Sequence, residues 1–191
     1  MSIYVVRHGQ TDLNKEKRIQ GRKGEPLNEE GKKQAEKLAQ ELQEIKFDIV
    51  ISSPQERAVQ TAQIISGISP TIDNRIDVYD MGEADRMKIQ DIEMLGLIPN
   101  PEKYKGVEKI EEFIYRIQSF MKSIEKIENV KYLNILIVGH KCTVGAIDAY
   151  FNNFADLKRS MSNASKNGEY KVYNIKELNA EKININHDYD R

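Results

Sequence analysis

The chain has one cysteine among 191 residues, a formal net charge of −1 and no long apolar run. The single Cys142 excludes an intrachain disulfide and favours a reducing compartment. The near-neutral charge gives no reason to expect a nucleic-acid partner. No segment offers the about 20 apolar residues that span a bilayer, and the N-terminus lacks a secretion-signal pattern. We therefore expect a cytoplasmic protein without a membrane partner.

The composition is that of a folded domain, because hydrophobic residues make up 39% of the chain and charged residues 31%. The length is enough for one domain with a substantial core. We expect a single domain over residues 1–178 and a polar tail over residues 179–191.

Two short apolar segments each end near a histidine. Residues 3–6 are followed by Arg7 and His8, and residues 135–138 are followed, after one glycine, by His140. Both segments are typical of buried strands, and ligands of open α/β sheets bind at the carboxyl ends of strands. Either histidine taken alone would more often be structural. If the two strands are neighbours, however, the imidazoles face each other across one pocket.

The remaining segments alternate between helical and strand patterns. Apolar spacing predicts helices over 28–42, from Pro54 onward, over 108–127 and over 143–151, and strands over 47–51, 70–72 and 169–175. This alternation predicts an α/β fold, a three-layer α/β/α sandwich with a mostly parallel sheet. Residues 9–26 are interpreted as a basic, glycine-containing loop, either for an anionic ligand or simply solvated. Residues 77–106 are interpreted as an acidic lid with one short helix near 88–95.

Two residues beside these strand ends have two interpretations each. Arg57 lies near the start of a predicted helix, where free backbone N–H groups attract anions, so it either binds an anion or is solvated. Cys142 is either a reactive thiol or a partly buried bystander.

Four motifs follow one another in a recognisable order. They are Arg7-His8-Gly9 with Thr11 and Asn14; Ile19-Gln20-Gly21 with Pro26-Leu27-Asn28, Gly31, Gln34 and Ala35; Ser52-Ser53-Pro54 with Arg57-Ala58 and Thr61-Ala62; and Val138-Gly139-His140. In this order they resemble the histidine phosphatase superfamily, which includes the phosphoglycerate mutases, and in particular its phosphatases. The resemblance covers most of the chain, from residue 3 to residue 151.

The resemblance implies a phosphoric monoester hydrolase of the histidine acid type that acts on a small phosphorylated metabolite. His8 would attack phosphorus and form a phosphohistidine. Arg7, Arg57 and His140 would stabilise the charge on the transferring phosphoryl group. Substrate-binding hydrogen bonds would come from Asn14, Gln20 and Gly21.

The same resemblance implies activity without a metal or another cofactor. A metal site built on the two histidines is the alternative interpretation. Arg7 and Lys141, which adjoin the histidines in the sequence, would repel a cation.

The chain departs from the family at the general acid. The family's glutamate lies four residues before a glycine, and counting back from Gly82 gives Val78, which cannot donate a proton. We expect Glu83 to take this role, with Asp80 and Asp85 as further candidates. Otherwise Glu83 is a solvated lid residue and the enzyme is slow on poor leaving groups, since a general acid contributes roughly two to four powers of ten in rate.

A second departure is Lys141, where the family usually has a small residue. Lys141 either holds a second anionic group of the substrate or points to solvent. Two other functions stay open: a mutase, which the short acidic lid disfavours, and a phospholigand-binding protein without turnover, which Val78 favours.

Overall fold

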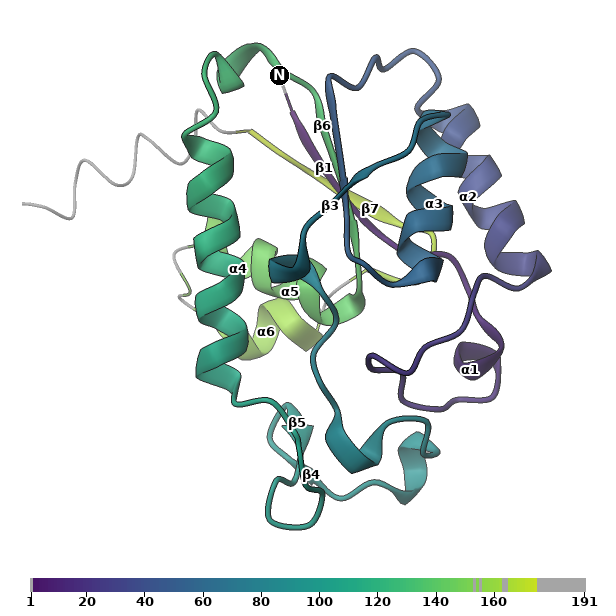
Figure 1. The fold of residues 1–191 in the computed structure, drawn as a ribbon, viewed down its shortest axis with the longest axis vertical. Helices are drawn as coiled ribbons and strands as arrows, with labels where there is room; N and C mark the ends of the chain where they lie inside the picture. The colour runs from purple at the N-terminus through teal and green to yellow at the C-terminus, as the bar shows by residue number, and fades with distance from the viewer. Residues whose placement is uncertain (1, 153, 155, 163–164, 175–191) are drawn as a thin grey trace, which may run out of the picture.

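The computed structural model describes residues 2–152, 154, 156–162 and 165–174. A five-stranded sheet lies at the centre (Figure 1). Its order is β3 (Thr71–Ile72), β2 (Ile49–Ser52), β6 (Ile135–Gly139), β1 (Ile3–Arg7) and β7 (Tyr170–Tyr173). All neighbouring strands are parallel except β7, which runs antiparallel to β1. The predicted mostly parallel sheet is confirmed, whereas the predicted tail lies outside the described residues.

Strands β1 and β6 are neighbours at the centre of the sheet. They run parallel in a register that places Arg7 opposite Gly139. His8 and His140 are the next residues of the two strands, so the chain leaves the sheet with both histidines at the same edge.

Helices cover both faces of the sheet, which confirms the three-layer sandwich. In Figure 1, α2 (Glu29–Glu41) and α3 (Glu56–Ser66) lie on one side, and α4 (Ile110–Glu125), α5 (Lys141–Phe151) and α6 (Leu157–Ser162) lie on the other. Successive side chains of a strand point to opposite faces. On β6, Leu136 and Val138 therefore pack in the cluster of α2 and α3, while Ile135 and Ile137 pack with α4 and α5.

Two predicted helix starts need correction. α3 has Gln55 as its N-cap, so Pro54 precedes the helix and Arg57 lies within its first turn. α5 begins at Lys141, two residues before the predicted start, because His140 alone separates β6 from the helix and serves as its N-cap. The predicted Asn28 cap of α2 is confirmed, since its side chain accepts the backbone N–H of Gly31.

Two segments contain more structure than their sequences predict. The loop over 9–26 holds a four-residue helix, α1 (Asp12–Lys15), which starts at a reciprocal cap between Thr11 and Asn14. The lid contains no helix near 88–95 beyond the single turn η3 (Ile89–Asp91), because the chain then turns at Gly96, with φ +64°, into a hairpin. This hairpin pairs β4 (Met94–Leu95) with β5 (Ile98–Pro99).

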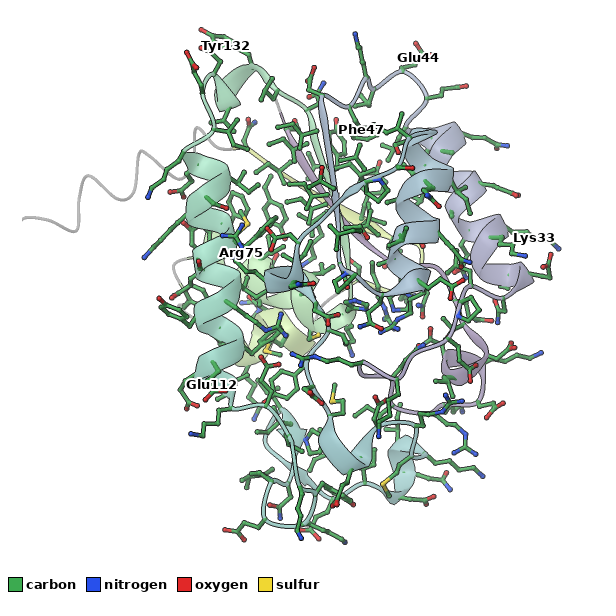
Figure 2. The ribbon with its side chains drawn as sticks, in the orientation of Figure 1. Lys33, Glu44, Phe47, Arg75, Glu112 and Tyr132 are labelled. Carbon is green, nitrogen blue, oxygen red and sulfur yellow. The ribbon has the colours of Figure 1, made fainter. Side chains whose placement is uncertain are left out.

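The inserted segment, residues 77–106, projects from one end of the sheet (Figure 1). It follows the single turn η1 (Asn74–Ile76) and contains a second, η2 (Gly82–Ala84); a further turn, η4 (Val130–Tyr132), precedes β6. Arg75 of η1 anchors the start of the segment to α4 by donating to Ser119 O at 3.2 Å and Ser123 Oγ at 3.0 Å (Figure 2). No helix among the described residues is long and apolar enough to cross a bilayer.

Candidate active site

A pocket of about 400 Å³ lies at the carboxyl ends of β1 and β6. Arg7, His8 and His140 line it from the strand ends, and Asn14 and Gln20 line it from the first loop. The two imidazole centroids are 5.2 Å apart. The structure thus brings together the histidines that the strand patterns place at one edge of the sheet.

His8 is held in one tautomer by its backbone neighbour. Its Nδ1 lies 2.7 Å from the carbonyl oxygen of Gly9, which can only accept, so Nδ1 carries the proton and Nε2 keeps a lone pair. Burial, followed by the charges of Arg57 and Arg7, holds the pKa of His8 well below its ordinary value. His8 is therefore neutral at physiological pH and presents the nucleophilic form of an imidazole.

Arg57 lies between the two histidines and is almost fully buried. Its Nε donates to Nε2 of His8 at 3.3 Å, and its Nη2 donates to Nδ1 of His140 at 3.2 Å and to the carbonyl of Gly21 at 3.1 Å. Burial lowers the pKa of Arg57 to about 10, and the charge of Asp77 opposes this change. Arg57 thus stays protonated at neutral pH and contacts both pocket histidines, although it is not itself one of the residues that line the pocket.

His140 is oriented by a row of hydrogen bonds behind the pocket. Its Nε2 lies 2.7 Å from Oγ of Ser53, which in turn lies 3.1 Å from Oδ1 of Asp77. The carboxylate can only accept a hydrogen bond, so the hydroxyl of Ser53 donates to Asp77 and its oxygen accepts from the Nε2–H of His140. Burial and Arg57 lower the pKa of His140 as well.

Thr11 orients two amide side chains of the pocket wall. Its backbone N–H donates to Oδ1 of Asn14 at 3.2 Å, and its hydroxyl donates to Oε1 of Gln20 at 2.8 Å. Both amide oxygens are therefore occupied, and the NH₂ end of each side chain is the donor left for a ligand.

Two buried donors lack a hydrogen-bond partner within the described part of the chain. They are Nε of Arg7 and Nε2 of Gln20, and both residues line the pocket. An unsatisfied buried donor costs free energy that a bound acceptor recovers. With Arg57 beside them, these donors form a site for an oxyanion such as phosphate.

The other predicted site residues occupy different surroundings. Gly21 does not offer its backbone to the pocket, because its N–H donates to Asp85 and its carbonyl accepts from Arg57. Lys141 lines the pocket at the start of α5, is exposed, and has no hydrogen bond or ion pair to any residue that the structure describes. Cys142 also lines the pocket, and burial raises the pKa of its thiol, which disfavours a reactive thiolate.

The candidate proton donors lie outside this pocket. Oε2 of Glu83 accepts the backbone N–H of Lys105 at 3.0 Å in a separate hollow that Asp80 and Asp85 also line. Asp80 pairs with Nη1 of Arg22 at 3.1 Å, and Asp85 accepts the N–H groups of Gly21 and Lys23. Among the described residues no carboxylate lines the main pocket, and Val78 forms part of its wall.

Two neighbours of the histidines were not identified as functional from the sequence. Asp77 directly precedes Val78, so counting back four residues from Gly82 stops one residue short of it. Ser53 belongs to a recognised motif, but nothing in its sequence context indicates that it accepts from His140. The residues that the structure describes contain no group of His, Cys, Asp and Glu side chains arranged to hold a metal ion.

Known proteins resemble this chain in sequence and in fold. The model of the histidine phosphatase superfamily (branch 1) matches residues 3–184. "Putative phosphoserine phosphatase 2" of Hydrogenobacter thermophilus is 35% identical over 156 residues, which cover 76% of this chain and 75% of the relative. "Uncharacterized phosphatase PhoE" of Bacillus subtilis is 31% identical over 151 residues, with the same coverage. The structure of a mycobacterial glucosyl-3-phosphoglycerate phosphatase with VO3 has a TM-score of 0.77 at 20% identity, covering 90% of this chain and 91% of that one.

Proposed function

Because the chain belongs to the histidine phosphatase superfamily, we propose that it is a phosphomonoesterase that forms a phosphohistidine on His8. One observation carries the proposal: a neutral imidazole, whose unprotonated Nε2 contacts Arg57, shares one pocket with buried, unsatisfied donors. Related proteins whose names include phosphatase support the choice of reaction.

In the first step Nε2 of His8 attacks phosphorus, and the bond to the ester oxygen breaks. Arg57 contacts this Nε2 when the pocket is empty, so a bound phosphate would draw its donors away and release the lone pair. Arg7, Arg57 and the amides of Asn14 and Gln20 would surround the non-bridging oxygens. Preorganised donors of this kind stabilise the charge that develops in phosphoryl transfer.

In the second step water attacks the phosphohistidine, and the N–P bond breaks to release inorganic phosphate and neutral His8. The ring of His140 lies opposite that of His8, and Ser53 keeps it in one orientation. His140 would donate to the phosphoryl group once its Nδ1, which accepts from Arg57, takes up a proton. The charge of the transferring group is matched by buried Arg57 and half-buried Arg7, so the reaction as proposed uses no metal and no cofactor.

The test is hydrolysis of 4-nitrophenyl phosphate in excess EDTA, combined with alkaline quenching of the enzyme after reaction with the ³²P-labelled ester. The wild-type protein should turn over and carry an acid-labile phosphoryl group. His8→Asn should lose both, while its fold, checked by circular dichroism, stays unchanged. EDTA-sensitive turnover, or turnover that survives in His8→Asn, would contradict the proposal.

The same experiment separates the two alternatives that the sequence leaves open. A mutase would transfer the label to a second phosphoglycerate molecule instead of to water. A binding protein would retain phosphate, measurable by titration calorimetry, without labelling or turnover.

A further inference from the structure

We infer that the substrate is a phosphate monoester of an apolar aromatic alcohol, that is, an aryl phosphate. This inference rests on the proposed phosphatase activity and names the chemistry of the group that His8 would displace. Three features of the pocket support it: an apolar wall, exposed apolar residues at that wall, and the lack of a proton donor for the leaving group.

The part of the pocket that faces away from the strand ends is apolar. Residues of the inserted segment and of its neighbours form this wall; they are Ile19, Val78, Met81, Ile92, Leu97 and Met161. The polar groups come instead from the strand ends and from the first loop. A volume of about 400 Å³ lies at the small end of ligand pockets and suits a phosphate with one or two rings.

Two further apolar residues that line the pocket are unusually exposed for their type. Ile89 is 57% exposed and Met94 is 45% exposed, and both line the pocket. Large apolar side chains gathered at a concave surface indicate an apolar ligand. Hydroxyl or ammonium groups of a sugar phosphate or phosphoamino acid would lose water against this wall without gaining a partner.

The chemistry of the leaving group also supports an aryl ester as the substrate. No carboxylate within the described residues lines the pocket, so no carboxyl group is at hand to protonate the ester oxygen as its bond to phosphorus breaks. A phenolic hydroxyl has a pKa of about 10, far below that of an aliphatic alcohol. An aryloxide can therefore leave with the electron pair of the P–O bond and take its proton from water afterwards.

Lys141 fits this leaving group. It lies at the pocket with an exposed side chain and no partner among the residues that the structure describes. A cation at this position can stabilise the departing aryloxide or lie against the face of its ring.

The first measurement compares kcat/KM for phenyl phosphate and 1-naphthyl phosphate with kcat/KM for O-phosphoserine and glycerol 2-phosphate, in EDTA. We expect the aryl esters to be preferred by at least about 100-fold, the lower range of a general-acid contribution. Naphthyl phosphate should have the lower KM, because its second ring adds apolar area against the wall.

Two variants of one hairpin test the wall itself. Leu97→Asn should raise the KM for 1-naphthyl phosphate about tenfold. Leu95→Asn is the matched control, because Leu95 lies in the same hairpin, is 59% exposed and does not line the pocket. Val78→Glu, which puts a carboxyl group in the wall, should raise kcat on glycerol 2-phosphate by about 100-fold.

The outcomes distinguish this inference from the proposed function. Equal or better turnover of phosphoserine or glycerol 2-phosphate by the wild-type protein would overturn the aryl substrate while leaving the phosphatase intact. Equal effects of Leu97→Asn and Leu95→Asn would overturn the role of the wall. Lack of both turnover and phosphoenzyme with every ester would overturn the phosphatase, and the inference with it.

Discussion

Oγ of Ser53 and Nε2 of His140 lie 2.7 Å apart, with the proton on the histidine. The serine oxygen can accept this hydrogen bond because its own hydroxyl donates to Asp77. Removing an acceptor from a buried N–H costs about 1–3 kcal/mol. The row therefore keeps the second imidazole of the pocket in one tautomer and one orientation.

Ser53→Ala should lower kcat about tenfold and reduce stability, because the Nε2–H of His140 loses its acceptor. Asp77→Asn should have a smaller effect, since an amide oxygen still accepts from Ser53. The measurements are kcat and KM with 4-nitrophenyl phosphate and the free energy of urea unfolding. A larger loss of kcat in Asp77→Asn than in Ser53→Ala would show that the negative charge matters more than the hydrogen bond.

The two buried histidines should make the fold sensitive to mild acid. Their pKa values are lowered in the folded state, whereas unfolded histidine titrates near about 6.5. Below that pH the unfolded chain takes up protons that the folded state does not, so stability falls as pH decreases. The slope approaches about 1.4 kcal/mol per pH unit for each histidine.

His8→Gln should remove one of these contributions and flatten the dependence of unfolding free energy on pH between about 6.5 and 5, above the range where most carboxylates titrate. The measurement is urea unfolding at several pH values in phosphate-free buffer, because a bound anion would stabilise the folded state. An unchanged slope in His8→Gln would mean that His8 is protonated in the fold.

Gly24 allows the first loop to cover Arg57. A Cβ at this position would collide with Nη1 of Arg57 and approach Nε2 of Gln20. Gly24→Ala should therefore displace the guanidinium and lower kcat/KM about 100-fold, a loss of about 2.7 kcal/mol in transition-state stabilisation. Lys23→Ala, in the same loop with its side chain exposed, is the control and should retain activity. Equal activity of the two variants would show that the loop moves aside without cost.

The sequence leaves two interpretations of Lys141, of which one is that it holds a second anionic group of the substrate. Lys141→Ala should raise the KM for 4-carboxyphenyl phosphate about two- to fivefold, as expected for an exposed ion pair of up to about 1 kcal/mol. The KM for phenyl phosphate should change less. Added salt should abolish the difference, because exposed charges are screened. Lys158→Ala, an exposed change on α6, is the comparison.

Glu83 is the carboxylate that the sequence proposes as the general acid, and the geometry favours a structural role. Glu83→Gln keeps an acceptor for the N–H of Lys105, so turnover of glycerol 2-phosphate should stay within about twofold of wild type, well short of a general acid's contribution. A loss of about 100-fold or more would instead establish Glu83 as the acid, reaching the pocket when substrate binds.

The sequence by itself determined the sheet and the edge at which the histidines lie. Residues 3–6 and 135–138 are continuous apolar runs, which is the pattern of strands buried on both faces. His8 and His140 each follow their run after one residue, so local structure places each at the end of a strand, whereas the pairing of β1 with β6 brings the two together. The motifs around Arg57 and Asn14, which resemble those of the family, indicated the family and the kind of ligand.

The tertiary structure alone decided which residues of the inserted segment line the pocket. The segment over 77–106 has no regular period, so its sequence does not indicate that Val78 lines the pocket while Glu83 lies in another hollow. Hydrogen bonds between distant residues, such as that from Ser53 to Asp77, have no counterpart in a local pattern. Local periodicity specifies which face of a strand or helix is buried, but long-range packing specifies which side chains meet.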